Sequence, residues 1–271
     1  MAKKKALVYT LMILVALLAV CIIVWKRAGT TEIRDYTQIL HSGELNVVTD
    51  YSSVGYYVSG DTIAGFNYDL IQLLKSYTSL RINVFLESSL DKSIYGLKEG
   101  KYDIIAQNIP TTSVLKDSLA FTEVIAQNRQ VLVQRRKQYN DQVEPIRSHL
   151  NLAKKTLYVP LNSPVKLRIH NLSHEIGDTI YIKEDPVYGA EQLIMMVASK
   201  DIDYAVCDEQ VAASLSRNLP EIDYSTLIGF THLEAWVVRN DAPVLLDSLN
   251  VWMKKIKESE AYSNIYMKYY K

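Results

Sequence analysis

Two histidines with an acidic neighbour form the arrangement in this sequence that most resembles a metal site. His170 and His174 are four residues apart, and Glu175 follows directly. On a helix this spacing puts both imidazoles on one face, where they could hold a zinc ion. Further ligands do not follow in order, and the segment reads as exposed. We therefore predict no metal and no cofactor.

A second polar stretch, Asn162-Ser163-Pro164, is typical of the start of a helix. Asn or Ser suits the N-cap, and Pro suits the first helical position. A helix start presents free N–H groups and a partial positive charge, so an acidic ligand group could dock there. Plain capping of the helix is the alternative interpretation.

The elements that would position such residues alternate between strand-like and helix-like stretches. In the first set, strands are expected over 45–48, 82–86 and 102–106, and helices over 68–77 and 90–98. In the second set, strands are expected over 156–159, 180–182 and 204–207, and helices from 164 and over 187–199. Two such sets predict two α/β lobes with largely parallel sheets.

The chain is expected to cross between the lobes twice. A strand over 129–135 leads out of the first set, and a strand over 235–238 precedes two final helices. We expect residues 43–130 and 229–271 to form lobe 1, and residues 131–228 to form lobe 2 with a crossover. A few connecting residues of this kind can act as a hinge.

The N-terminal region has the features of a membrane anchor. Residues 6–25 are uncharged, and at about 1.5 Å per residue they span roughly 30 Å, the thickness of a bilayer's hydrocarbon core. Lys26 and Arg27 close this run. We predict a cytoplasmic stub and single transmembrane helix over 1–27, and a polar tether over 28–42.

The predicted anchor places the rest of the chain outside the cytoplasmic membrane, in the periplasm. A lipoprotein signal ending at Cys21 is the second choice. Such a signal needs a small residue before the cysteine, and Val20 stands there.

The charge balance argues against nucleic acid as a partner. Thirty basic and thirty acidic residues cancel, so no strongly basic face is implied. The 19 tyrosines, against 4 phenylalanines, suit a wet cleft in which a polar tip reaches water or a ligand. A compositional habit of the source organism explains them equally well.

Several spaced motifs resemble the family 3 solute-binding proteins. They are the opening strand at 43–49, Gly-Phe-Asn-Tyr-Asp-Leu at 65–70, the stretch 97–106 with its Gly-Lys-Tyr-Asp-Ile, the stretch 197–208 with its Ile-Asp-Tyr, and the ending at 265–270. The resemblance covers about residues 43–270. It implies an α/β, two-lobed periplasmic-binding-protein type 2 fold with a double hinge crossover, here preceded by one N-terminal transmembrane helix.

Within this family, the sequence is similar to the binding module of membrane-bound lytic murein transglycosylase F, through Ile202-Asp203-Tyr204 and the double tyrosine at 269–270. In that enzyme a lysozyme-like catalytic domain follows the module. Here the sequence ends one residue after Tyr270. Glycosidic cleavage needs an acid held in a substrate groove, and no stretch here supplies that setting. We therefore expect no enzymatic activity.

The resemblance also implies where a ligand lies, which is between the lobes and beyond the carboxyl ends of the strands. Asp208 matches the family aspartate that takes a ligand's amino group, although it could instead cap the helix that follows. Tyr51 could stack on a ligand or plug the edge of the cleft. The expected ligand-binding residues are Asp50, Tyr51, Asn108, Thr112, Asn162, Ser163 and Asp208.

One segment departs from the family pattern. Amino-acid binders read roughly Gly-x-Thr-x-Thr-x-x-Arg there, and the arginine forks two hydrogen bonds to the ligand's carboxylate. Here Pro110 replaces the first threonine, Thr112 keeps the second, and Leu115 replaces the arginine. Lys116 is the next residue, and on a helix its side chain would point about 100° away from that of residue 115. Its ammonium group is also a point charge, whereas an arginine guanidinium is planar and can bind both carboxylate oxygens. The departure argues against an ordinary free α-amino acid as ligand.

These observations predict an anchored protein whose lobes close on a small polar ligand, either amino-acid-like or a peptidoglycan fragment, for transport or sensing. A transporter or a cell-wall enzyme is the expected partner. Two alternatives stay open. One is an interaction module of cell-wall metabolism that has kept the fold and lost the ligand, and the other is a component of a murein-cleaving enzyme that acts with a separate catalytic chain.

Overall fold

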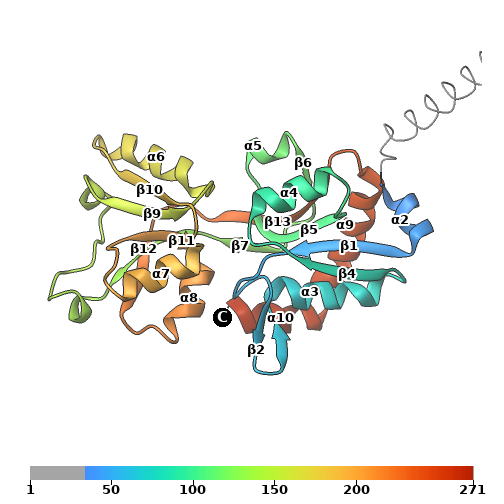
Figure 1. Cartoon of the computed structure of the whole chain (residues 1–271), viewed down its shortest axis with the longest axis horizontal. Helices are drawn as coiled ribbons and strands as arrows, with labels where there is room; N and C mark the ends of the chain where they lie inside the picture. The colour runs from blue at the N-terminus through green and yellow to red at the C-terminus, as the bar shows by residue number, and fades with distance from the viewer. Residues whose placement is uncertain (1–33, 271) are drawn as a thin grey trace, which may run out of the picture. The chain divides into compact units, whose positions relative to one another are not determined.

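A computed structural model describes residues 34–270, except for the side chains of residues 59 and 114. One of its two larger sheets organises lobe 1 (Figure 1). β1 pairs in parallel with β4 and β5, whereas β13 runs antiparallel to β5, β6 and β7. The strand order is β4 (Arg81–Leu86), β1 (Glu44–Thr49), β5 (Ile104–Pro110), β13 (His232–Arg239) and β6 (Leu119–Phe121), with β7 (Ala126–Asn128) also paired to β13.

The other large sheet organises lobe 2. Its order is β10 (Tyr181–Asp185), β9 (Thr156–Pro160), β11 (Ala205–Asp208), β8 (Gln130–Arg135) and β12 (Ile222–Leu227). β9 is parallel to both of its neighbours, and β8 is antiparallel to both of its own. The prediction of two α/β lobes is confirmed, but the prediction of largely parallel sheets is wrong because both sheets are mixed. The antiparallel strands are the ones that follow the crossings between the lobes, β8 in lobe 2 and β13 in lobe 1.

The chain passes between the two sheets twice, as the sequence predicts. β7 ends in lobe 1 two residues before β8 begins in lobe 2, and β12 of lobe 2 is followed by β13 of lobe 1. Figure 1 shows these two connections side by side between the lobes. A pair of short connections is the arrangement that permits hinge motion.

Helices cover both faces of the lobe 1 sheet. Successive strand residues point to opposite faces, so Val47 packs with one set of helices and Val48 with the other. The first set is α2 (Tyr36–Ser42), α3 (Phe66–Leu74), α9 (Pro243–Lys257) and α10 (Glu260–Tyr270), and the second is α4 (Leu90–Lys98) and α5 (Ser113–Lys116). A small hairpin of β2 (Tyr57–Ser59) and β3 (Thr62–Ala64) precedes α3.

Lobe 2 repeats this layering. Leu132 packs under α6 (Val165–Ile176), whereas Val131 and Val133 pack under α7 (Ala190–Ala198) and α8 (Glu209–Ser216). Each lobe therefore has its own two-sided apolar core.

The stretch 28–42, expected to be a polar tether, contains the helix α2. Asp35 accepts a hydrogen bond from the backbone N–H of Tyr36 at its start, and Gly43 ends it in the left-handed conformation. Ile39 is fully buried, and the Tyr36 ring meets Trp252 of α9 edge-on at 5.8 Å. Asp35 also accepts from the N–H of Leu245 at 2.8 Å, so one carboxylate holds the starts of α2 and α9 together.

The predicted transmembrane helix over 1–27 lies outside the described residues. Across residues 34–270, each helix is too short or too polar to cross a bilayer.

Candidate functional site

A buried acid–histidine cluster lies where the chain crosses between the lobes. β13 supplies His232 and Glu234, and β11 ends on Asp208. The His232 Nε2 atom is 3.4 Å from Glu234 Oε1 and 3.8 Å from Asp208 Oδ1. Glu234 is fully buried, whereas a third of the Asp208 side chain is exposed. Asp208 is thus the member of the cluster that a ligand can reach.

Side-chain amides satisfy the buried Glu234 carboxylate. Asn108 Nδ2 donates to Oε2 at 2.6 Å, and Asn128 Nδ2 donates to Oε1 at 3.1 Å. Asn67 Nδ2 in turn donates to Asn108 Oδ1 at 2.9 Å, and the Trp236 indole donates to Asn67 at 2.8 Å. A buried charge is tolerated when hydrogen bonds of this kind replace its water.

The last described residue, Tyr270, covers Asn108. Its hydroxyl accepts a hydrogen bond from Asn108 Nδ2 at 2.5 Å. Its ring stacks on Tyr266 with centroids 4.7 Å apart and meets Phe66 edge-on at 4.8 Å. Burial, followed by the nearby Glu234, raises the pKa of the Tyr270 hydroxyl, which therefore stays neutral. The Asn108 side chain is fully engaged by protein groups in this arrangement.

Asp208 occupies the N-cap position of α8, but its side chain makes no capping hydrogen bond within residues 34–270. Gln130 Nε2 is 3.4 Å from its Oδ1. Burial, and then repulsion from Glu234, raises the pKa of Asp208 to about 7, against a smaller lowering by His232. Burial alone would lower the pKa of His232, but the two carboxylates outweigh it, and the net shift is upward.

The same three residues have metal-ligand chemistry. One donor atom from each lies within 4.8 Å of the others. However, both oxygens of Glu234 already accept amide hydrogen bonds. The Nε2 atom of His232 is buried without a hydrogen-bond partner among the described residues, and it lies 3.4 Å from Glu234 and 3.8 Å from Asp208.

Two hydrogen bonds join the lobes away from this cluster. Glu191 at the start of α7 accepts from the backbone N–H of Ser53 at 2.7 Å. Asn162, before α6, donates through Nδ2 to Asp91 of α4 at 2.6 Å. Asp50 is the residue that follows β1, and burial raises its pKa. Hydrogen bonds partly oppose this shift, and the nearby Glu191 carboxylate adds to it. The loops after β1 and β9 thus face the opposite lobe.

The other predicted ligand-binding residues, Tyr51, Thr112 and Ser163, do not join the acid–histidine cluster. Tyr51 is 61% exposed, with its ring 6.3 Å from Tyr56, and Thr112 precedes α5. Among the described residues, the side chains of Tyr51, Thr112 and Ser163 make no hydrogen bond with another residue. Leu115, at the position of the missing arginine, packs against the lobe 1 core.

The expected start of α6 also differs. The helix begins at Val165 after Pro164, and no side chain of the described chain caps it. Asn162 instead adopts a left-handed backbone (φ 58°) and turns its amide towards Asp91. The capping interpretation of Asn162 and Ser163 is therefore wrong.

Sequence reasoning missed His232, Glu234 and Tyr270. The first two are two residues apart on one strand, so they share a face of the sheet. An acid next to Ala235-Trp236-Val237-Val238 was a usable signal, because a charge beside a buried strand needs partners. Nothing local marks Tyr270.

Comparison with known proteins identifies the family. Residues 45–271 match the model of bacterial extracellular solute-binding proteins, family 3. The chain belongs to this family. The resemblance inferred from the motifs is confirmed.

Curated relatives of this family-3 chain include two named membrane-bound lytic murein transglycosylase F. The protein from Desulfosudis oleivorans is 26% identical over 86% of this chain and 50% of its own length, and that from Shewanella halifaxensis is 23% identical over 84% and 46%. The chain spans about half the length of these relatives.

Solved structures share the fold. An ancestral amino-acid-binding protein, a precursor of cyclohexadienyl dehydratase, matches with a TM-score of 0.73 and 21% identity, covering 87% of this chain and 99% of that one. An ancestral arginine-binding protein bound to arginine matches with a TM-score of 0.72 and 19% identity over 84% and 99%. A putative ABC-transporter binding component from Wolinella succinogenes complexed with lysine matches with a TM-score of 0.71 and 17% identity over 84% and 96%.

Proposed function

We propose that this chain is a membrane-anchored, extracytoplasmic binding protein whose lobes close on a small polar ligand that carries an amino group. The observation that carries the proposal is Asp208, a partly exposed carboxylate beside the hinge that has two long contacts among the described residues, to Gln130 at 3.4 Å and to His232 at 3.8 Å. An ammonium group is the natural partner of such a carboxylate, because a charge-assisted hydrogen bond is stronger than a neutral one. Neighbours in the fold were solved with arginine or lysine bound, which agrees with a cationic ligand.

The proposed ligand does not depend on an α-carboxylate at the usual position. Leu115 offers no side-chain hydrogen bond there and packs, partly buried, against the lobe 1 core. Lysine and cadaverine differ only by this carboxylate, so they form a direct test. We expect the two to bind within about threefold of each other, and Asp208→Asn to weaken both at least tenfold, with Asp201→Asn on the surface as control.

Calorimetric titration of purified residues 28–271 with this pair, with arginine and agmatine and with muropeptides measures the affinities. Small-angle scattering of the same samples measures closure. Absence of binding across all of these amines, or an Asp208→Asn protein that binds them normally, would refute the proposal.

A second candidate function is an interaction module without a ligand. It is favoured by Tyr270, which occupies the Asn108 amide from within the chain. This function predicts that no small molecule of the panel binds, and that Tyr270→Ala does not create binding. Appearance of amine binding in Tyr270→Ala would instead mean that Tyr270 competes with a ligand.

The anchor, the partner and the link to cell-wall enzymes are parts of the same proposal. Residues 6–25 would hold the protein at the membrane, and the bound form would act on a transporter or a cell-wall enzyme. Membrane fractionation with and without residues 1–27 tests the anchor. Recovery of the full-length protein in the soluble fraction would contradict it.

A further inference from the structure

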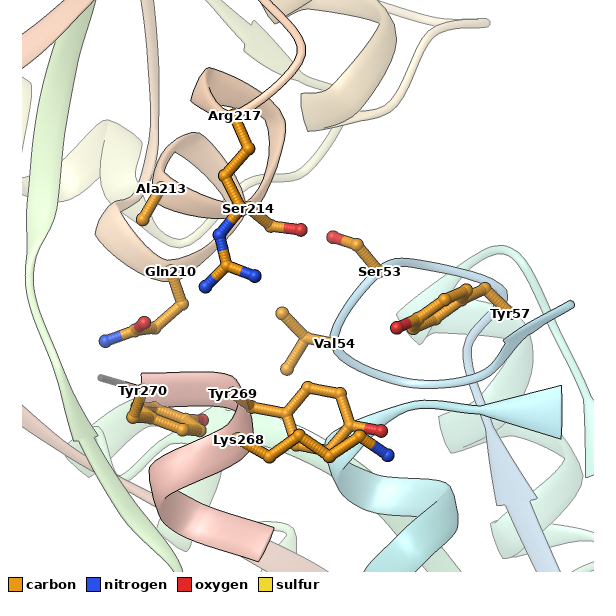
Figure 2. A pocket seen from close by; sticks show the side chains of 10 residues that line it. All are labelled: Ser53, Val54, Tyr57, Gln210, Ala213, Ser214, Arg217, Lys268, Tyr269 and Tyr270. Atoms are coloured by element: carbon orange, nitrogen blue, oxygen red, sulfur yellow. The ribbon is translucent and has the colours of Figure 1, made fainter. Parts of the chain in front are cut away.

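A pocket of about 220 Å³ opens beside Tyr270 (Figure 2). One wall comes from α8 and its C-cap residue, with Gln210, Ser214 and Arg217 at helical spacing. The facing walls come from the loop after β1 and from the end of α10. Lobe 2 and lobe 1 therefore both line it.

Arg217 is the unneutralised charge in this pocket. Figure 2 shows its guanidinium directed from the end of α8 towards Tyr269. Its side chain has no ion pair or hydrogen bond to any residue within 34–270, and none of the described lining residues is acidic. The other lining cation, Lys268, is paired with Asp69 at 2.9 Å. The guanidinium of Arg217 therefore offers its planar set of N–H donors to a ligand in the pocket.

Polar groups around Arg217 have unused hydrogen-bonding capacity. Ser53 Oγ is buried and has no hydrogen-bond partner in the described chain. Figure 2 shows it facing Ser214 across the opening, whereas the Gln210 amide lies on the Tyr270 side of the pocket. A buried hydroxyl without a partner is costly, so a ligand atom that bonded to it would be stabilised.

The ring of Tyr269 gives the pocket an apolar side. Its hydroxyl is occupied, since it accepts from the N–H of Gly65 at 2.8 Å and donates to Asp69 at 2.8 Å. The ring is thereby fixed in orientation, and Lys268 Nζ lies over it at 4.8 Å from its centroid.

We propose that this pocket is a second ligand site, for the carboxylate of a small organic acid, with Arg217 as the forked donor. A guanidinium matches a carboxylate bidentately, and Ser53, Ser214 and Gln210 supply further donors. Because both lobes contribute donors, a bound acid bridges them and favours the closed arrangement. The site is separate from Asp208 and needs no amino group.

The test is a titration of isotopically labelled residues 28–271 with N-acetyl-L-alanine at constant ionic strength, followed by amide chemical shifts. We expect saturable shifts in α8 and α10, no saturable shifts with the neutral N-acetyl-L-alaninamide, and at least tenfold weaker binding by Arg217→Met. Arg217→Lys should also bind more weakly, because an ammonium is not a fork. Arg81→Met, which removes an exposed arginine of lobe 1, is the matched control.

Three results would overturn the proposal. They are the absence of saturable shifts, unchanged binding by Arg217→Met, and inorganic phosphate binding as tightly as the acid. Since the probe has no amino group, its binding does not depend on whether Asp208 receives an amine. Either proposal can therefore fail without the other.

Discussion

The hydroxyl of Tyr270 lies 2.5 Å from the amide nitrogen of Asn108, although 162 positions separate the two residues. This contact ties the C-terminal helix to the strand end that lines the cleft. The same tyrosine also lines the Arg217 pocket. Removing the hydroxyl tests this contact directly.

Tyr270→Phe should destabilise the fold by about 1 kcal/mol, because one N–H of Asn108 loses its acceptor while the ring packing is kept. Urea unfolding measures the change. Tyr95→Phe is the control, since Tyr95 is 68% exposed on α4. Equal losses in the two variants would mean that the contact with Asn108 contributes nothing.

Folding stability should fall as the pH rises through 7. The pKa of Asp208 is about 7 in the folded state, above its usual value of 3.8, so the folded protein binds the extra proton between these values. The raised pKa of His232 acts in the same direction, because its protonated form is favoured by folding and is lost at higher pH.

Asp208→Asn should remove the larger part of this slope and be more stable than the natural protein at pH 8, by about 1–2 kcal/mol after allowance for partial exposure. Unfolding curves at pH 5, 6, 7 and 8 measure both proteins. Parallel pH profiles would contradict the assignment of the titration to Asp208.

Amine binding should strengthen between pH 6 and 8. An ammonium group interacts with the ionised form of Asp208, and this form becomes dominant only above about pH 7. Binding at pH 6.5 should therefore release a proton, which calorimetry in buffers of different ionisation enthalpy detects. Uptake of a proton would be the opposite of the expected sign.

Glu191→Ala should open the lobes. The carboxylate accepts the Ser53 N–H across the gap, and a hydrogen bond to a charged group contributes about 1.5–3 kcal/mol. Its loss shifts the open–closed equilibrium by roughly tenfold or more. An increased radius of gyration in small-angle scattering is expected. Glu258→Ala, at the exposed end of α9, should leave the radius unchanged.

Gly96→Ala should destabilise lobe 1 even though Gly96 lies in a helix, where alanine is normally better by about 1 kcal/mol. An added Cβ would lie 2.5 Å from the Tyr102 ring, which is only 1% exposed and cannot move aside. Overpacking of this kind costs about 1–3 kcal/mol and outweighs the gain in propensity. Thermal unfolding measures the effect. Lys92→Ala, on the exposed side of the same helix, should be nearly neutral.

Much of the fold could be predicted from periodicity. The helix expected over 90–98 is α4 with the same bounds, and the strand expected over 45–48 lies within β1. The short elements could not be predicted, because three-residue strands such as β6 and β7 have no period to detect. The mixed sheets were missed for a related reason, since strand direction depends on the path between lobes rather than on local pattern.

The candidate site was predicted less completely. Asn108 and Asp208 belong to one cluster, because Asn108 contacts Glu234 and His232 lies between Glu234 and Asp208. However, the direct partners of Asn108 lie far away in the sequence. Tyr270 lines the pocket beside α8. Its position depends on how α10 packs on Phe66, which no local motif encodes.

The shared carboxylate of Asp35 has a mechanical consequence. It binds α2 to the start of α9, a long helix buried along lobe 1, whereas lobe 2 meets that body through the crossing strands, the two bridging hydrogen bonds, the Asp208–His232 contact and the packing of α8 near α10. A pull applied at residue 35 would therefore be borne by lobe 1, and lobe 2 would be the half free to swing.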